Sequence, residues 1–453
     1  MPIQTINPAT GAVIETYNEM NEAAAFSIIE KVQTAFTAYQ HTSFDERRAC
    51  FQRLHDGLNE QLENFAELMT QEMGKPITQS RAEIQKCLLL IEHYIQYGEI
   101  YLKPKPLAPH ALVCYQPLGT IFGIMPWNFP LWQVFRFAVP TLMAGNTAIL
   151  KHAPISTGCA YAIEALFQAA FAIKDVFRAI VVNNEVASAV IPHPHIKAVT
   201  LTGSARAGKS VAKEAGDALK KVVLELGGSD PYLILADADL ENAAEACAFS
   251  RLWNAGQVCI AAKRIIVVKS VLPAFLSALK EKMKSYQPSD PLAEATTLGP
   301  LARADLRENL HRQVTLTVSQ GATLHCGGEM PAGPGFYYPV TLLTNVKPGM
   351  CAFEEEVFGP VFSIIEATDE NEAIQLANNT VYGLTAAVFT RDLARGEAIA
   401  RNQLQAGCVA VNRYAATEPA LPFGGINQSG FGRELGESGA RSFVNEKTVL
   451  VSA

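Results

Sequence analysis

Short apolar runs alternate with amphipathic stretches along most of this chain. Ser43 and Glu46 have the spacing of a capping box, and apolar side chains then recur at helical spacing from Phe51 to Leu68, which predicts a helix. From Pro117 onward, short apolar runs are typical of buried parallel strands. These strands are expected at Thr120–Ile124, Asn146–Lys151, Ala179–Asn183, Lys197–Thr202 and Lys221–Leu226.

A second series of apolar runs follows Gly227 and Gly228. Its strands are expected at Tyr232–Ala236, Arg264–Val268, Val361–Glu366, Thr385–Thr390 and Gly407–Val411. Strands that alternate with helices in this way are the sequence form of doubly wound α/β domains, which bind ligands at the carboxyl ends of their strands. We therefore predict an α/β fold with two such domains that meet near residue 228, and an active site in the cleft between them.

Composition narrows the class of protein without giving a function. The 453 residues are 49% hydrophobic and 18% charged, which is typical of a globular protein with two or three domains. The net charge of −7 is spread over interleaved acids and bases, so no nucleic-acid partner is expected. No apolar run reaches the ~18–20 residues of a membrane helix, and the first residues lack the pattern of a secretory signal. Nine cysteines without a CxxC pair favour a reducing cytoplasm.

Three polar residues have surroundings that suggest chemistry, although each also has a structural interpretation. Cys259 lies in a glycine-containing loop between a helical stretch and a strand, and is either a nucleophile or a buried apolar side chain. Glu225 ends an apolar strand, where it is either a desolvated general base or a carboxylate that reaches solvent. Asn128, between Pro126 and Pro130, is either an oxyanion donor or part of a structural turn.

A second group of residues suggests a phosphate-containing cofactor. A predicted strand ends at Gly203 and Ser204 and is followed by a helix, which offers free backbone N–H groups to a phosphate. The segment is not a GxGxxG motif, so the signal is weak by itself. Lys151 ends another predicted strand, where it either reaches a ribose or is solvated. No cluster of metal ligands is visible, and no metal is expected.

Together these segments are much more specific than any one of them. Their order and spacing resemble the aldehyde dehydrogenase superfamily along essentially the full length of the chain. The resemblance implies a dinucleotide-binding domain of residues 1–98 and 118–227, a catalytic domain of residues 228–428, and a small β oligomerisation element of residues 99–117 and 429–453 that assembles a homodimer or homotetramer. The matching motifs are Asn7–Gly11, Pro126–Pro130, Gly203–Gly208, Glu225–Gly228, Gly256–Cys259, Glu356–Pro360, Pro422–Gly425 and Ser429–Glu434.

The resemblance also assigns catalytic and cofactor-binding roles. It implies that Cys259 attacks the aldehyde, that Asn128 donates to the oxyanion, that hydride then leaves to NAD or NADP, and that Glu225 activates the water that hydrolyses the thioester. Glu434 matches a carboxylate that relays a proton from the base. Cofactor contacts are implied for Trp127, Lys151, Pro154, Gly203, Ser204, Leu226, Glu356 and Phe358.

Within the superfamily the likeness is greatest to bacterial succinate-semialdehyde dehydrogenases. It implies that Arg136 and Thr417 bind the distal carboxylate of the substrate, whereas an Arg in a tunnel is otherwise paired permanently with a protein carboxylate. Trp253 stands where some members have a second Arg, so a general aliphatic or aromatic aldehyde is an alternative substrate. A catalytically silent homologue is a third hypothesis. The remaining substrate contacts are expected from Phe129, Trp132, Trp253 and Phe423.

One position bears on the choice between the two dinucleotides. NAD-selective members often carry a Glu three residues after the ribose-binding lysine, and its charge repels a 2′-phosphate. Pro154 occupies that position here. We therefore expect the protein to use both NAD and NADP.

Overall fold

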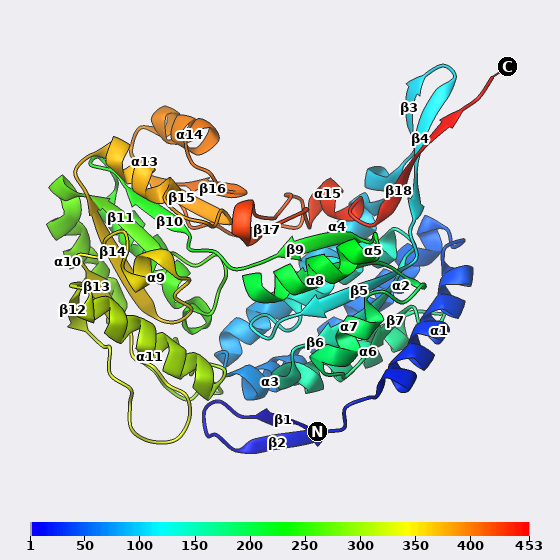
Figure 1. The fold of residues 1–453 in the computed structure, drawn as a ribbon, viewed down its shortest axis with the longest axis horizontal. Coiled ribbons are helices and arrows are strands. Elements are labelled where there is room, and N and C mark those ends of the chain that lie inside the picture. The colour runs from blue at the N-terminus through cyan, green and yellow to red at the C-terminus, as the bar shows by residue number, and fades with distance from the viewer. Residues whose placement is uncertain (1, 453) are drawn as a thin grey trace.

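The computed structural model describes residues 2–452, and its two largest sheets lie in two separate lobes (Figure 1). The lobe drawn mainly in blue and green contains a six-stranded sheet in the order β17-β9-β8-β5-β6-β7. All neighbours in this sheet are parallel except β17, which is antiparallel to β9. Its strands are β5 (Thr120–Met125), β6 (Thr147–His152), β7 (Phe177–Ala179), β8 (Ile196–Thr202), β9 (Lys221–Glu225) and β17 (Gly430–Phe431).

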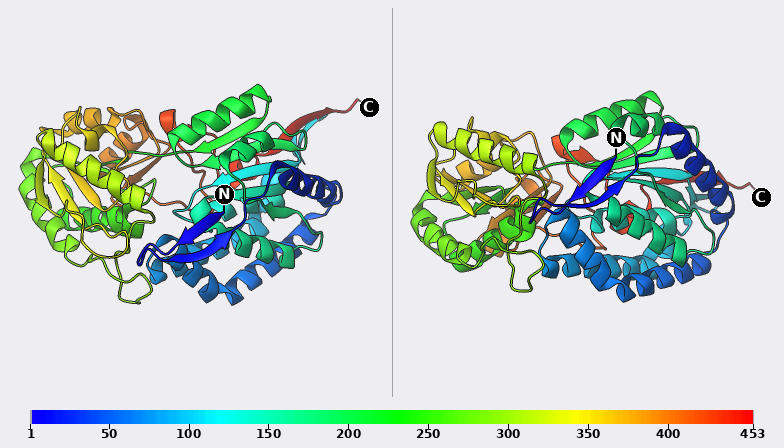
Figure 2. Two further views of the ribbon diagram at one scale, coloured as in Figure 1. Left: turned by 60° about the horizontal axis from the view of Figure 1, so that its bottom comes forward. Right: turned by 90° about the horizontal axis from the view of Figure 1, so that it is seen from below.

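The other lobe contains a seven-stranded sheet in the order β12-β13-β14-β11-β10-β15-β16. Only β12 is antiparallel to its neighbour. The further views show the same two lobes side by side (Figure 2). The strands of this sheet are β10 (Pro231–Ile234), β11 (Arg264–Val268), β12 (Thr323–Cys326), β13 (Thr341–Thr344), β14 (Val361–Ala367), β15 (Thr385–Phe389) and β16 (Cys408–Val411).

Helices pack against both sheets and bury separate hydrophobic cores in the two lobes. The capping box expected at Ser43 and Glu46 is present at the start of the second helix. Around the six-stranded sheet lie α1 (Glu22–Tyr39), α2 (Phe44–Glu60), α3 (Leu62–Met73), α4 (Ile77–Leu102), α5 (Trp132–Met143), η1 (Pro154–Ser156), α6 (Thr157–Ala170), α7 (Asn184–Val190), α8 (Ala205–Asp217), η4 (Asn427–Ser429) and α15 (Gly436–Ala440). Around the seven-stranded sheet lie α9 (Leu240–Leu252), η2 (Trp253–Gly256), η3 (Lys269–Val271), α10 (Leu272–Met283), α11 (Ala304–Ser319), α12 (Cys351–Glu354), α13 (Glu370–Asn378) and α14 (Leu393–Asn402).

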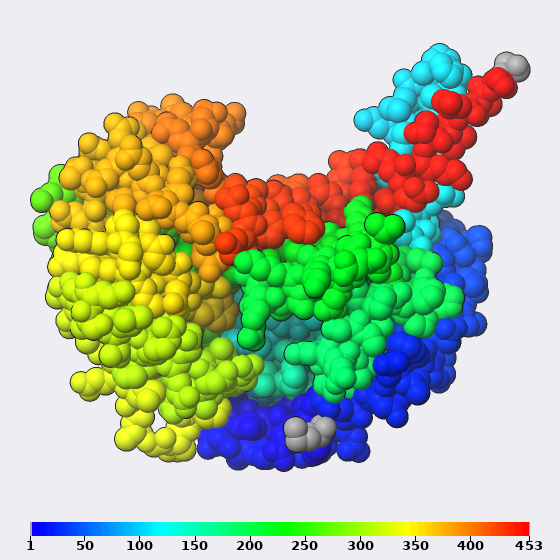
Figure 3. Space-filling view, viewed as in Figure 1, coloured from blue at the N-terminus to red at the C-terminus, as the bar shows by residue number. Residues whose placement is uncertain are grey.

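Two small sheets complete the fold. A hairpin of β1 (Ile3–Ile6) and β2 (Val13–Tyr17) runs along the bottom of the molecule in Figure 1, and the loop after β1 contacts the other lobe because Pro8 O accepts from the backbone N–H of Phe336 at 2.8 Å. A three-stranded sheet projects from the body as an arm, which the space-filling view shows clearly (Figure 3). Its strands are β3 (Lys105–Ala108), β4 (Ala111–Pro117) and β18 (Val444–Leu450).

The predicted α/β fold with two doubly wound domains is confirmed, and the differences are local. The strand expected at Ala179–Asn183 is β7 at Phe177–Ala179, because only Ile180 of the run after it bonds to β6, through its N–H and Leu150 O at 2.8 Å, before the chain leads into α7. Pairs β1–β2 and β12–β13 were not predicted, since their strands are short and partly polar. Gly430 and Phe431, assigned from the resemblance to the oligomerisation element, form β17 on the edge of the six-stranded sheet.

Candidate active site

Cys259 lies in a cavity of about 320 Å³ that residues from both lobes line. The loop before it is strained, because Asn254 and Ala255 both have φ 52°, in the left-handed region that costs a non-glycine residue roughly 1–3 kcal/mol. Side chains hold this loop: Asn254 N–H donates to Gln79 Oε1 at 2.7 Å, and Gln257 Oε1 accepts from the N–H of Ala302 at 2.9 Å. The surrounding structure therefore fixes where the thiol is presented.

The electrostatic surroundings of Cys259 keep its thiol protonated at neutral pH. Burial raises the pKa of Cys259 to about 11, while the charges of Lys263 and Arg136 lower it in part. Lys263, which the sequence analysis did not single out, donates to the backbone carbonyl of Cys259 and forms an ion pair with Glu356 at 3.1 Å. Cys259 must therefore lose a proton before it can act as a nucleophile.

Asn128 is buried beside the same loop, in the turn between β5 and α5. Its Nδ2 donates to Gln257 O at 2.9 Å, and its Oδ1 accepts from Gln133 Nε2 at 3.1 Å. The backbone carbonyl of Asn128 accepts from Asn254 Nδ2 at 2.8 Å, which ties the turn to the cysteine loop. An amide nitrogen carries two hydrogens, so one N–H of Asn128 remains for an oxyanion.

Glu225 ends β9 and is only 2% exposed. Within residues 2–452 neither of its carboxylate oxygens has a hydrogen-bond partner. Burial raises the pKa of Glu225 well above its usual value, the charge of Glu434 raises it further, and Arg136 and Arg433 oppose the shift. A Cβ at Gly424 would lie 2.7 Å from Glu225 Oε1, so this glycine leaves room for the carboxylate. The surroundings of Glu225 suit a general base.

Arg136 has a protein partner. The sequence left open whether the substrate or the protein supplies its carboxylate, and the structure shows an ion pair with Glu434 and a hydrogen bond to Thr202 Oγ1 at 3.2 Å. Burial lowers the pKa of Arg136, but Glu434, Glu225 and Cys259 outweigh that effect and raise it. The charge of the guanidinium thus interacts with all three of these groups, and Arg136 also lines the cavity of Cys259.

The wall of the cavity is largely aromatic. Phe129, Trp132, Trp253, Phe423 and Thr417, all expected from the sequence, line it together with Phe249, Tyr414 and Lys86. Lys86 Nζ donates to Thr417 Oγ1 and lies 4.4 Å from the ring centroid of Trp132. Phe135, on the same helix as Trp132, does not line the cavity and packs in the core against Phe167 with ring centroids 5.5 Å apart.

Residues expected to hold the cofactor gather at the carboxyl ends of β6, β8 and β9. The side chain of Lys151 is buried at the end of β6, and Pro154 begins η1 just beyond it. Ser204 caps α8 through Ala207 N–H at 3.2 Å, and a Cβ at Gly203 would meet only Leu201 at 3.5 Å, which leaves open space beside the helix start. Leu226 follows β9 and packs in the core that α8 covers.

Glu356, Trp127 and Phe358 form a second group of expected cofactor contacts, and Lys263 links it to the cysteine loop through Glu356 and Phe358. Glu356 Oε1 accepts from the backbone N–H of Gly228 at 3.2 Å, and a side chain at Gly227 would overlap the same carboxylate. The rings of Trp127 and Phe358 meet edge to face with centroids 6.0 Å apart. The structure therefore brings groups suited to a ribose and an aromatic ring next to the loop of Cys259.

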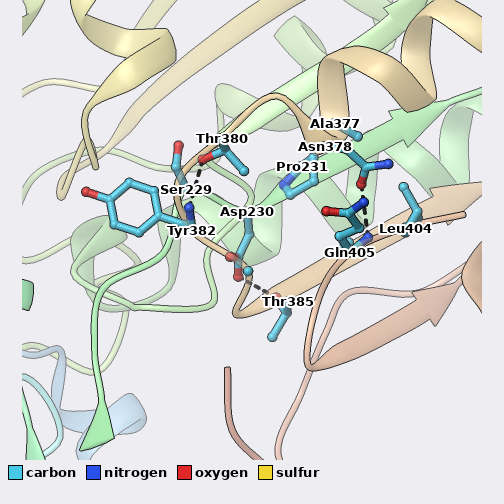
Figure 4. Close-up of a pocket in the computed structure, with 12 residues that line it drawn as sticks. Ser229, Asp230, Pro231, Ala377, Asn378, Thr380, Tyr382, Thr385, Leu404 and Gln405 are labelled. Atoms are coloured by element: carbon cyan, nitrogen blue, oxygen red, sulfur yellow. Dashed lines mark hydrogen bonds between the residues drawn. The ribbon is translucent and has the colours of Figure 1, made fainter. Parts of the chain in front are cut away.

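A second cavity is lined by residues 229–231 at the start of β10 and by residues of the segments 377–386 and 404–405, and its volume of about 10 Å³ is too small for a substrate (Figure 4). Its wall includes Asp230, whose carboxylate accepts a hydrogen bond from Thr385 and whose backbone carbonyl accepts from the N–H groups of Lys263 and Arg264. Burial raises the pKa of Asp230 to about 6. These contacts support the strand that begins at Arg264 and therefore the loop before it.

Two further properties of the described chain bear on its class. No group of three or more His, Cys, Asp or Glu residues among residues 2–452 is arranged to hold a metal ion. No helix in the same part of the chain is long and apolar enough to cross a membrane.

Comparison with known proteins gives the family. The aldehyde dehydrogenase family matches residues 1–449. The chain is 45% identical to the Escherichia coli (strain K12) succinate semialdehyde dehydrogenase (NAD(P)+) Sad, over 98% of this chain and 97% of the relative. It is 42% identical to a probable succinate-semialdehyde dehydrogenase (NADP+) of Synechocystis, over the full length of both. The structure of succinic semialdehyde dehydrogenase from Streptococcus pyogenes with NADP+ superposes with a TM-score of 0.97, 34% identity and full coverage of both chains.

Fold and sequence thus agree on one class of enzyme. The chain belongs to the aldehyde dehydrogenase family, and it is an enzyme that oxidises aldehydes to carboxylic acids. The resemblance identified from the sequence motifs is confirmed.

Proposed function

We propose that this enzyme oxidises succinate semialdehyde to succinate with NAD(P)+, through a thioester on Cys259. The observation that carries the proposal is one cavity that combines Cys259 with the ammonium group of Lys86 and the hydroxyl of Thr417. An aldehyde with a carboxylate at its far end matches that combination. The names of the Escherichia coli, Synechocystis and Streptococcus pyogenes relatives support it.

The proposed reaction follows from what each side chain can do. Cys259 Sγ, once deprotonated, forms a bond to the aldehyde carbon, while Asn128 Nδ2 and the backbone N–H of Cys259 donate to the oxyanion. NAD(P)+, held by the residues at the strand ends, would supply the acceptor for the hydride and its electron pair, which leave the former aldehyde carbon. Glu225 then takes a proton from water as the water oxygen attacks the thioester, and Cys259 departs as a thiolate. Glu434 is the carboxylate proposed to pass this proton on.

The residues at the strand ends fit a dinucleotide. The open space beside Gly203 and the backbone N–H groups at the start of α8 suit a pyrophosphate. Lys151 suits the adenosine ribose, and Glu356, which the small size of Gly227 admits, suits the nicotinamide ribose. Trp127, Phe358, Pro154, Ser204 and Leu226 complete the proposed cofactor site.

We expect both NAD and NADP to support turnover. Pro154 carries no charge to repel a 2′-phosphate, and Lys151 supplies a cation near that position. The ratio of kcat/KM for the two cofactors should therefore stay below ~10³-fold, since a larger ratio needs ~4 kcal/mol of discrimination. Lys151→Met should reduce kcat/KM with NADP more than with NAD. A ratio above that limit, or an equal loss with both cofactors, would contradict this assignment.

Arg136 is expected to act on the catalytic carboxylates. Removing its charge in Arg136→Met raises the pKa of Glu225, Glu434 and Cys259, so their reactive forms appear only at higher pH. At neutral pH, kcat/KM should fall by ~10-fold or more for both succinate semialdehyde and butanal, and part of the loss should be recovered as pH rises. Arg136→Lys, which keeps the charge, is the matched control. A loss confined to succinate semialdehyde would instead assign the substrate carboxylate to Arg136.

A substrate panel tests the proposed function itself. The wild-type enzyme is assayed by NADH or NADPH formation with succinate semialdehyde, glutarate semialdehyde, butanal and benzaldehyde. The proposal requires kcat/KM to be largest for succinate semialdehyde. Equal or higher kcat/KM values for butanal or benzaldehyde would mean that the aromatic wall of the cavity determines which substrate binds. The protein would then be a general aldehyde dehydrogenase.

Assembly and location are part of the same proposal. The strand β18 lies at the edge of the projecting arm. Because an unpaired strand edge is suited to pairing with another chain, we propose that the arm assembles a homodimer or homotetramer. All nine cysteines are free, which supports a cytoplasmic location.

A further inference from the structure

Lys86 differs from the other cation of the substrate cavity in having no carboxylate partner. Arg136 is committed to Glu434. Within residues 2–452 no carboxylate forms an ion pair with Lys86. Glu83, one helical turn before it, is already bound to Lys75 and accepts from the backbone N–H groups at the start of α5. The charge of Lys86 is thus not neutralised by the protein.

The position of Lys86 directs that charge into the cavity. Gln79, Ala82, Glu83 and Lys86 all line the cavity, and their spacing places them on one face of α4. Lys86 Nζ donates to the hydroxyl of Thr417 and lies over the face of the Trp132 ring, and both of these groups are neutral. A partly desolvated ammonium with such neighbours favours the binding of an anion from solution. The ion pair so formed offsets the free energy that the ammonium lost when it was removed from water.

Thr417 adds a donor at the same point. Its Oγ1 accepts the hydrogen bond from Lys86, so its own hydrogen is free to donate elsewhere. A carboxylate beside both groups would receive one hydrogen bond from an ammonium and one from a hydroxyl. Burial, with the nearby charge of Arg136, lowers the pKa of Lys86 to about 8, and a bound carboxylate would favour its charged form.

We propose that Lys86 is the specificity-determining residue of this enzyme, and that with Thr417 it binds the distal carboxylate of ω-carboxylate aldehydes. Arg136 then serves the catalytic carboxylates, although it borders the same cavity. The inference rests on the proposed function, since it names the group that recognises the proposed substrate class. The residue comes from α4, far from the cysteine loop in the sequence, and no motif pointed to it.

The experiment compares substrates that differ only in the distal group. Lys86→Met keeps the length of the side chain and removes its charge. For succinate semialdehyde, kcat/KM should fall about 10- to 100-fold, mostly through KM, as for a lost hydrogen bond to a charged group. For butanal, kcat/KM should stay within about threefold. Lys103→Met, at the exposed C-terminal end of α4, is the matched control and should change neither value.

A binding measurement without turnover separates recognition from catalysis. Calorimetry should show that succinate binds wild type more tightly than butyrate, which lacks the distal carboxylate, and that Lys86→Met removes this difference. Thr417→Val should reduce it in part, and provides a second arm if Lys86→Met does not fold.

The outcomes distinguish the two proposals. If wild type does not prefer succinate semialdehyde to butanal, the proposed function fails. If wild type shows that preference but Lys86→Met and Thr417→Val retain it, the proposed function stands and the role of Lys86 is wrong. An equal loss on both aldehydes, with succinate binding unchanged, would also overturn the inference.

Discussion

Cys259→Ala should abolish aldehyde oxidation while NAD(P)H binding persists. The thiol forms the covalent bond to the aldehyde carbon, and within residues 2–452 no other cysteine lines the cavity. Turnover should therefore fall by ~10³-fold or more. Steady-state formation of reduced cofactor measures the loss, and quenching of protein fluorescence by NADPH measures the retained binding.

Cys408→Ala is the matched control for this substitution. Cys408 is also half-buried and packs in the same hydrophobic cluster as Cys259, but it does not line the cavity. Its loss should leave most of the activity. If Cys259→Ala retained more than about a percent of wild-type turnover, the nucleophile would have to be sought elsewhere.

Glu225→Gln should separate the two halves of the reaction. The amide cannot accept a proton from water, so hydrolysis of the thioester should slow by at least ~10²-fold, the usual contribution of a general base. Hydride transfer precedes this step and should persist. Rapid mixing should therefore show a burst of about one equivalent of reduced cofactor per site, followed by a much slower steady rate.

The same carboxylate should give the wild-type enzyme its pH dependence. Only the ionised form of Glu225 is a base, and burial together with Glu434 raises its pKa. Steady-state turnover should accordingly increase as pH rises through the raised pKa, and Glu225→Gln should remove that increase. Loss of the burst together with the steady rate would mean that Glu225 is needed earlier, to deprotonate Cys259.

The sequence could predict features that depend on short segments. Alternating apolar runs predicted ten strands of the two large sheets, because a strand buried on both faces leaves a continuous apolar signature. The predicted site residues Cys259, Arg136, Thr417 and Trp132 line one cavity in the structure. The catalytic role of Cys259 itself came from the family resemblance, since a lone cysteine in a loop can be either a nucleophile or a buried apolar side chain.

What the sequence could not predict depends on contacts between distant segments. Lys86 lies on a helix whose residues bear no motif, and its charge faces the cavity only because α4 packs beside α5 and the segment at Thr417. The pairing of Arg136 with Glu434 joins residues from opposite parts of the chain. In the sequence, Lys263 is simply a lysine before an arginine, and nothing marks it as part of the site. Only the fold of the loop brings it into contact with Cys259 and Glu356. Which charged side chains pair with each other is therefore decided by the tertiary structure.

The short strand β17 has a consequence for how the chain acquires its fold during synthesis. It pairs with β9 at Glu225 and so closes the edge of the six-stranded sheet. Just before it, Ser429 O accepts from the N–H of Leu226, and Ser429 Oγ donates to Gly227 O. The ribosome makes these residues only after it has made every strand of the seven-stranded sheet, from β10 to β16. Until β17 has been made, the edge strand β9 of the six-stranded sheet stays unpaired, and the proposed base Glu225 at its end stays exposed. Such non-local closure slows folding and exposes an unpaired edge to other chains, so a nascent chain has more need of chaperones than either lobe alone would suggest.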